Sequence, residues 1–375
     1  MIPPTLMADQ TLFLDPEVFE ADHIPEQFRH RDAQVQEIAF AIRPALRGVR
    51  PLNTVLRGLP GTGKTTSVRL VFAELEAHSS QVVPVYVNCH HDRSAYSIFG
   101  TIYRRLFGQM PPRSGVSVTR VLDAIGRSLA GDNRVLLVCL DDIHGLRSGD
   151  LLNDVLYPLL RLYEEHHGAR SGVIATTSDM DLDFDRELDP AVASSFRPTE
   201  VFFPPYTAGE VREILKARIT TGLYPGVVPP GRLDVVVART MATGDLRVGL
   251  DLLKRAVLAA EREGRYEVEE EDVRKAFEVS KHVHLAATVK TLSAAERQVL
   301  AVIAAMAGGR EPVASGDLYR EVNRRARMSY TAFFEAVKKF DQMRLVDVRY
   351  LSGWGRTREV VLRYDVEAVE RVCGG

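Results

Sequence analysis

The strongest constraint on the fold comes from residues 58–65, whose sequence GLPGTGKT fits the phosphate-loop pattern G-x-x-x-x-G-K-[ST] in full. A short β-rich run, 54–56, precedes this loop, and a helix-length segment, 65–78, follows it. Glycines allow successive backbone N–H groups to point at one anion, and the helix that follows adds the positive end of its dipole. We therefore expect a phosphate-binding loop between a strand and a helix.

The loop supplies the expected contacts to ATP or ADP. We expect the Lys64 ammonium to reach the β- and γ-phosphates and the Thr65 hydroxyl to bind Mg²⁺. The residues that we expect around the phosphates are Pro60, Gly61, Thr62, Gly63, Lys64, Thr65 and Thr66.

A second motif lies downstream, where the apolar run 135–140 is followed by Asp141 and Asp142. Such a run predicts a strand buried on both faces, and ligands of α/β proteins bind at the carboxyl ends of the strands. We expect Asp141 to hold Mg²⁺ and Asp142 to orient or deprotonate the attacking water. The alternative is an acidic loop after a buried strand.

The chain divides into three patterns. In 1–206, β-rich runs alternate with helix-length segments, which predicts a parallel sheet covered by helices on both faces. The runs are 54–56, 82–87, 135–140, 172–177 and 200–203. Strand signals stop in 207–288, where four helices are expected, at 208–220, 232–241, 246–263 and 269–280. In 289–375 we expect helices at 293–307, 315–324 and 329–343, followed by strands at 345–350 and 359–364.

These motifs together resemble the archaeal origin-recognition and replication-initiator proteins, which are AAA+ ATPases related to the eukaryotic origin recognition complex and its helicase-loading partner. The resemblance covers roughly 22–365 and includes HIPEQFRHRD at 23–32, FPPYT at 203–207 and GDLR at 244–247. It implies an α/β AAA+ domain with a five-stranded parallel sheet, an all-α lid and a C-terminal winged helix.

The resemblance also assigns roles to individual positions. Ile24 and Pro25 match the segment that lines the adenine, and Tyr206 and Arg218 match nucleotide contacts around the lid. Arg247 matches the second sensor, an arginine that touches the γ-phosphate. The alternatives are hinge packing for Tyr206, a surface charge for Arg218 and an ion pair within the lid for Arg247.

Three departures from the family pattern predict slow ATP hydrolysis. Asp142 stands where the family usually has Glu, and Thr177-Ser178 stand where a sensor Asn is common. Ala191 and Ser195 stand where the family has arginine-finger residues. An arginine finger accelerates hydrolysis by about 10³–10⁵-fold where it has been measured.

Basic charge gathers near the C-terminus, although the whole chain has a net charge of −2. Residues 320–349 hold eight basic and four acidic residues, and 329–343 is the expected recognition helix of a winged helix. The candidate DNA contacts are Arg113, Arg324, Arg325, Arg327, Tyr330, Thr331, Lys338, Lys339, Trp354, Arg356 and Arg358. The alternative is a winged helix that packs on a protein.

The expected function is an ATP/ADP-binding initiator that binds duplex origin DNA and helps load the replicative helicase, with related initiator subunits as partners. The rival interpretation is a STAND-like or transcriptional switch whose winged helix binds protein or promoter DNA. We expect no membrane association, because no apolar run approaches about 20 residues, and a place in the cytoplasm at the nucleoid.

The histidine pairs 90–91 and 166–167 are not expected to bind a metal ion. Adjacent histidines do not share a helix face, and no third ligand follows at a suitable spacing. Cys89, Cys139 and Cys373 show no C-x-x-C spacing, which argues against a zinc site or a disulfide framework.

Overall fold

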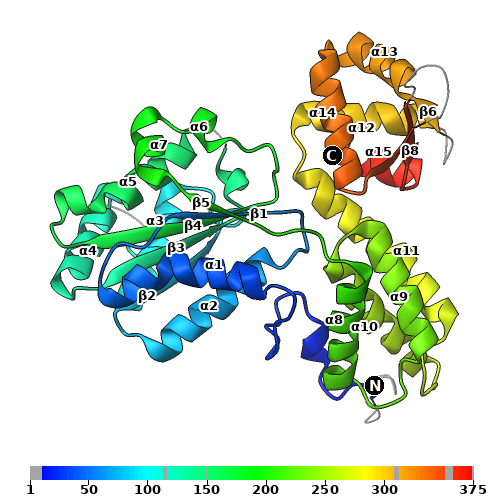
Figure 1. Ribbon diagram of the computed structural model, residues 1–375, viewed down its shortest axis with the longest axis horizontal. Helices are drawn as coiled ribbons and strands as arrows, with labels where there is room; N and C mark the ends of the chain where they lie inside the picture. Colours follow the sequence, from blue (N-terminus) through cyan, green and yellow to red (C-terminus); the bar gives the residue numbers. More distant parts are fainter. Residues whose placement is uncertain (1–10, 113–115, 148–149, 308–311, 351–357, 374–375) are drawn as a thin grey trace. The chain divides into compact units, whose positions relative to one another are not determined.

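The computed structural model describes residues 11–112, 116–147, 150–307, 312–350 and 358–373 (Figure 1). The chain forms two compact units. One comprises residues 24–205, and the other combines the N-terminal segment up to residue 23 with residues 206–375.

The 24–205 unit is built on a five-stranded sheet in the order β2-β3-β4-β1-β5, in which every pairing is parallel. Its strands are β1 (Thr54–Arg57), β2 (Val82–Asn88), β3 (Val135–Asp141), β4 (Arg170–Thr177) and β5 (Thr199–Phe202). This confirms the predicted α/β fold class, and each predicted strand lies within three residues of its observed bounds.

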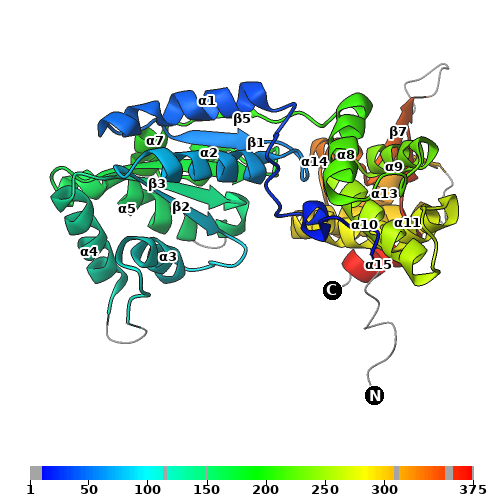
Figure 2. The ribbon, with the colours of Figure 1, turned by 90° about the horizontal axis from the view of Figure 1, so that it is seen from below.

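Helices cover both faces of this sheet (Figure 2). One face carries α1 (Asp32–Ile42), η3 (Arg43–Arg47) and α2 (Lys64–His78). The other carries α3 (Ala95–Phe107), α4 (Val118–Gly131), η4 (Ile143–Leu146), α5 (Leu151–Glu165), α6 (Phe184–Glu187) and α7 (Pro190–Phe196).

Strand β3 shows why the sheet has two cores. Leu136, Val138 and Leu140 pack on the side of α3 to α7, whereas Val135, Leu137 and Cys139 pack on the side of α1 and α2. Successive side chains of a strand point to opposite faces, so Asp141 falls on the α2 side. Because of this alternation, the Asp141 side chain lies on the same face of the sheet as the helix that follows the phosphate loop, whereas the sequence alone shows only two adjacent acids.

The second unit begins with a bundle of four helices, α8 (Ala208–Gly222), α9 (Pro230–Thr243), α10 (Leu246–Arg262) and α11 (Glu270–Lys290). Thr207 and Glu210 form a capping box at the start of α8, and the Asp245 side chain caps α10. Helix α11 continues through 281–290, beyond the expected helix 269–280 and past the expected domain boundary at 288. That stretch contains neither Gly nor Pro, so no residue type in it breaks a helix.

The N-terminal segment does not belong to the sheet domain, in contrast to the predicted domain 1–206. The short helix η2 (Pro16–Phe19) packs in the core of the helical bundle through Phe13, Val18 and Phe19. Gly222 accommodates this contact, because a Cβ there would lie 2.5 Å from the Phe19 ring. Residues 11–23 thus belong with the helical bundle and not with the sheet.

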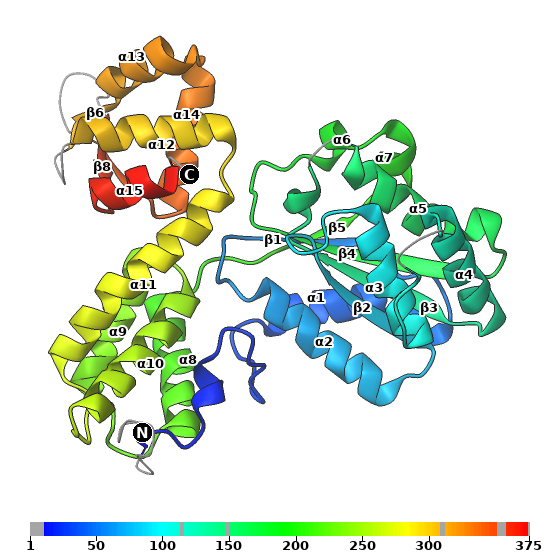
Figure 3. The same ribbon diagram turned by 180° about the vertical axis from the view of Figure 1, so that it is seen from behind.

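The C-terminal part has the order helix, strand, helix, helix, strand, strand, which matches that of a winged helix. Its elements are α12 (Ala294–Ala307), β6 (Val313–Ala314), α13 (Ser315–Ala326), α14 (Tyr330–Gln342), β7 (Val346–Tyr350), β8 (Arg358–Leu362) and α15 (Val366–Cys373). The strands pair antiparallel in the order β6-β8-β7, and α15 lies against α12 (Figure 3). The sequence interpretation missed β6, which is too short to show a pattern, and α15.

No helix in the described part of the chain is both long and apolar enough to cross a membrane.

Candidate functional site

The phosphate loop lies where the sequence predicts it, between β1 and α2. Gly61 and Gly63 have φ angles of 73° and 92°, in the left-handed region that glycine adopts most readily. Gly58 passes close to the chain before α8, because a Cβ there would lie 2.4 Å from the Phe203 carbonyl oxygen. The glycines therefore give the loop both its turn and its close packing.

Lys64 is buried within this loop. Its Nζ donates to the carbonyl oxygens of Gly58 at 2.7 Å and Leu59 at 2.9 Å, and to the Ser178 hydroxyl at 3.2 Å. Ser178 follows β4, in the region where the family has its sensor residue. The structure thus brings Lys64 and the Thr177-Ser178 pair together, with a hydroxyl in place of an amide.

Thr65 and Asp141 form the centre of a network of oxygen atoms. The Thr65 hydroxyl lies 3.0 Å from both carboxylate oxygens of Asp141. Thr176 Oγ1 donates to Asp141 Oδ1 at 2.6 Å, and the Tyr86 hydroxyl donates to Oδ2 at 2.5 Å. Hydroxyl and carboxylate oxygens are ligands that suit Mg²⁺, so the pair fits the predicted metal role.

Sequence reasoning missed Tyr86 and Thr176. Tyr86 shares the α2 face of the sheet with Asp141, and its pKa is raised, chiefly by burial and then by the Asp141 charge. Alternation along β2 could have found it, because Asn88, two residues on, pairs with Asp141 in the sheet register. Both hydroxyls hold the carboxylate in a defined orientation.

Asp142 faces away from this network. Its backbone is left-handed, with φ 54° and ψ 50°, and its N–H donates to Thr176 Oγ1 at 2.9 Å. Asp tolerates this conformation better than most residues. The turn sends the Asp142 carboxylate toward His90, whose Nε2 lies 3.8 Å from Oδ2.

His144 completes this corner of the site. Its ring meets the His90 ring edge to face, with centroids 5.4 Å apart, and its pKa is lowered, chiefly by burial. His90 follows the end of β2, and His144 lies in η4 just after Asp142. The sequence interpretation found no third ligand near His90-His91, whereas the fold places two beside His90.

Arg31 holds the phosphate loop through hydrogen bonds to backbone carbonyl oxygens. It is buried, and its guanidinium donates to the carbonyl oxygens of Thr62 at 2.8 Å and Pro204 at 2.6 Å. The sequence analysis placed Arg31 only within the family segment 23–32, and α1 begins one residue later, at Asp32. Arg31 thus ties the phosphate loop to the segment after β5.

The two residues that are predicted to line the adenine, Ile24 and Pro25, lie in the 24–205 unit with the phosphate loop. Ile24 is 38% exposed and lines a groove of about 690 Å³ with Arg69, Tyr86 and Arg105. Pro25 is half-buried. Ile24 therefore shares a groove with the tyrosine that bonds Asp141.

The remaining nucleotide candidates lie in the second unit. Tyr206 is buried in the core of the helical bundle. Arg247 forms an ion pair with Asp245 at 2.5 Å and keeps its side chain 47% exposed. Both arrangements match the alternatives of hinge packing and a lid ion pair, and contact with a nucleotide stays a prediction for both.

Arg218 is not a surface charge, because it is buried against the N-terminal segment. Its guanidinium donates to the carbonyl oxygens of Val18 at 2.9 Å and His23 at 3.4 Å. Burial lowers the pKa of the Arg218 guanidinium.

We expect Arg218→Met to detach residues 11–23 from the helical bundle. The substitution leaves a buried carbonyl without its donor, which costs about 1–3 kcal/mol. Hydrogen exchange of residues 11–23 should accelerate, whereas the exposed Lys216→Met control should leave it unchanged. Unchanged protection in the Arg218 variant would show that Phe13, Val18 and Phe19 hold the segment alone.

The two positions at which the family has arginine-finger residues, 191 and 195, carry no guanidinium in this chain. Ala191 and Ser195 lie on α7, where Ser195 Oγ donates to the Ala191 carbonyl oxygen at 3.1 Å. Arg197 follows the helix, exposed and with φ 33°.

Several predicted DNA contacts lie exposed around α13 and α14. Arg324 and Arg325 both pair with Glu321, at 2.6 and 2.5 Å. Tyr330 is 56% exposed and stacks edge-on against Tyr319. The other exposed candidates are Thr331, Lys338 and Arg327, which follows the last residue of α13.

Two candidates differ from the prediction. Lys339 is buried and pairs with Glu296 of α12 at 2.8 Å, so it does not lie on the exposed face of α14. It follows Ala336 by three residues and turns toward the core. Arg358 is half-buried over the Phe334 ring, 4.3 Å from its centroid. Arg113, Trp354 and Arg356 lie outside the described residues.

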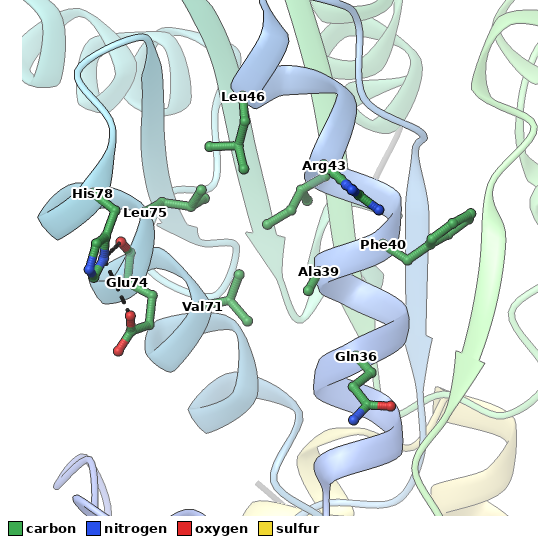
Figure 4. A pocket seen from close by; sticks show the side chains of 10 residues that line it. Gln36, Ala39, Phe40, Arg43, Leu46, Val71, Glu74, Leu75 and His78 are labelled. Carbon is green, nitrogen blue, oxygen red and sulfur yellow. Dashed lines mark hydrogen bonds and ion pairs between the residues drawn. The ribbon is translucent and has the colours of Figure 1, made fainter.

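A separate apolar groove of about 590 Å³ lies between α1 and the C-terminal half of α2 (Figure 4). Phe40, which is 67% exposed, and Leu46 line it, and at its rim His78 Nδ1 lies 3.5 Å from Glu74 Oε2. Leu75 lies about 16 Å along the helix from Lys64 at 1.5 Å per residue, so the groove is distinct from the phosphate loop.

Two known families match parts of this chain. The AAA domain matches residues 49–178, which include the phosphate loop and both acids. The Cdc6 AAA+ ATPase-type lid domain matches residues 212–278, which include Arg218 and Arg247.

Similarity to individual proteins extends over almost the whole chain. The chain is 43% identical over 362 residues to ORC1-type DNA replication protein 6 of Halobacterium salinarum, with 96% of each protein covered. Among solved structures, it resembles the Aeropyrum pernix ORC1 protein in complex with DNA, with 31% identity, a TM-score of 0.67 and 98% of each chain covered. It also resembles the Aeropyrum pernix ORC2 protein in ADPNP–ADP complexes, with 26% identity, a TM-score of 0.75 and coverage of 97% and 98%.

Proposed function

Because the chain belongs to the ORC1-type DNA replication protein family, we propose that it is an ATP- and ADP-binding initiator that binds duplex origin DNA and helps load the replicative helicase. Its place of action is the nucleoid in the cytoplasm. Its protein partners are the helicase and related initiator subunits.

The nucleotide part of the proposal rests on the loop and the two acids. Lys64, now bonded to loop carbonyls, would exchange them for phosphate oxygens. Thr65 and Asp141 would hold Mg²⁺, which neutralises charge on the phosphates when bound. Tyr86 and Thr176 keep the Asp141 carboxylate oriented, and Arg247 would add a positive charge from the lid.

The observation that carries the DNA part is the exposed basic end of α13. Arg324 and Arg325 project from its last turn just before α14, which is the expected recognition helix. Arginines in this position can bond phosphates while the next helix enters a major groove. The ORC1 protein that this chain resembles was solved in complex with DNA.

We expect the double substitution Arg324→Ala, Arg325→Ala to weaken binding to all duplexes. Each lost phosphate contact should reduce the slope of log K against log[salt] by about 0.9. A titration of labelled duplex at several salt concentrations measures this slope.

The lid offers a matched control, because Arg274 and Lys275 pair with Glu271 at the same i,i+3 and i,i+4 spacings. Arg274→Ala with Lys275→Ala removes the same charge and should leave the salt slope unchanged. Equal slopes for wild type and the α13 variant would favour the rival interpretation, in which the winged helix binds a protein.

A further inference from the structure

The carboxyl ends of β2 and β3 hold a cluster that the nucleotide mechanism does not use in full. His90, Asp142 and His144, here called the histidine–aspartate cluster, each offer one ligand atom, and these atoms lie within 4.8 Å of one another. The three residues come from the turn after β2, the end of β3 and η4. We propose that this cluster binds a divalent transition-metal ion of the zinc class, in a site distinct from the Thr65–Asp141 magnesium site.

The spacing of the ligand atoms supports this assignment. Zinc bonds of about 2.0–2.1 Å place tetrahedral ligands about 3.3 Å apart. His90 Nε2 and Asp142 Oδ2 are already 3.8 Å apart. Small side-chain rotations would therefore bring all three atoms onto one ion, and a fourth position would stay open to water.

The state of His144 is a second, independent observation. Both of its ring nitrogens are buried, and neither has a hydrogen-bond partner among the described residues. A buried polar atom without a partner costs free energy, so native proteins satisfy nearly all of them. A metal ion bound to one ring nitrogen would provide the partner that is otherwise missing.

The donor set selects the kind of ion. Two imidazoles and one carboxylate suit Zn²⁺ and other first-row divalent ions, whereas Mg²⁺ and Ca²⁺ prefer oxygen ligands. The left-handed backbone of Asp142 turns its carboxylate toward His90, and Asp141 stays with Thr65. Two adjacent acids therefore serve two different cation sites.

Occupation of the cluster has a consequence for hydrolysis. An ion bound to the Asp142 carboxylate occupies the group that we expect to orient the attacking water. Zinc should then slow ATP hydrolysis without displacing the nucleotide. This consequence rests on the proposed function, whereas metal binding itself does not.

The test is a Co²⁺ titration of the full chain, stripped of metal and held in excess Mg²⁺ so that the Thr65–Asp141 site is saturated. We expect one Co²⁺ to bind per chain with visible d–d absorption, and Zn²⁺ to displace it. Loss of an outer-shell partner commonly costs 10–100-fold in metal affinity, so loss of a ligand should cost at least about 100-fold. We expect that loss in His144→Ala and in His90→Ala.

His91→Ala is the matched control, because His91 is adjacent to His90 but exposed and outside the cluster. It should bind Co²⁺ as wild type does. Absence of one-to-one binding in wild type, or unchanged affinity in both cluster variants, would overturn the site. Zinc that binds to wild type without slowing its hydrolysis would refute the inhibition alone.

Discussion

Lys64→Ala should abolish binding of Mg–ATP. Lys64 is the one basic residue in 58–65, so its loss leaves the phosphates without a cation in the loop. A charge pair about 4 Å apart is worth about 4 kcal/mol at an effective dielectric of 20, which corresponds to roughly a thousandfold in affinity. Calorimetric titration with Mg–ATP measures the change.

A fold control is needed because the Lys64 ammonium also bonds two loop carbonyls. Lys64→Met keeps most of the buried stem and should lose affinity to the same extent. Lys216→Ala, on an exposed face of α8, should bind as wild type does. Normal affinity in both Lys64 variants would show that the loop does not bind the phosphates through this lysine.

Asp142→Glu should convert a slow ATPase into a faster one. The extra methylene extends the carboxylate by about 1.5 Å, toward the water that a glutamate would reach. A positioned general base contributes about 10²–10⁴-fold, so recovery of part of this reach should raise the steady-state rate at least about tenfold. The assay is run in excess Mg²⁺ with a chelator selective for zinc over magnesium, so that the histidine–aspartate cluster stays empty while Mg–ATP is intact.

Wild type should stay slow when DNA or more protein is added, because Ala191 and Ser195 offer no guanidinium to a neighbouring subunit. Asp142→Asn should hydrolyse ATP no faster than wild type. This control distinguishes the effect of a longer side chain from the effect of removing the negative charge. Glutamate is less suited than aspartate to the left-handed backbone at 142, so thermal unfolding must show that the variant is folded. Brisk turnover by wild type, or no gain in the glutamate variant, would contradict the expectation.

The histidine–aspartate cluster shows where sequence reasoning stopped. His90 and His144 are 54 positions apart, and nothing in their spacing marks them as neighbours. The register of β2 beside β3 brings them together, because Asn88 pairs with Asp141. The same register brings Tyr86 to the Asp141 carboxylate, a contact that no motif contains.

The C-terminal part of the chain shows a similar division between what the sequence predicts and what the tertiary structure decides. Helical periodicity correctly predicted α13 and α14. It did not predict that Lys339 turns inward, because that depends on the presence of Glu296 on α12. A helical pattern identifies a buried face but not the ion pair at its edge.

The sequence by itself determined the parallel α/β fold, the phosphate loop and the position of Asp141, because each depends on short-range signals. A glycine-rich turn before a helix and an acid at the end of an apolar strand carry their geometry in consecutive residues. Only the tertiary structure decided the direction of Asp142, the burial of Arg218 under residues 11–23 and the meeting of His90 with His144. These depend on one backbone angle and on packing between distant segments, which consecutive residues do not encode.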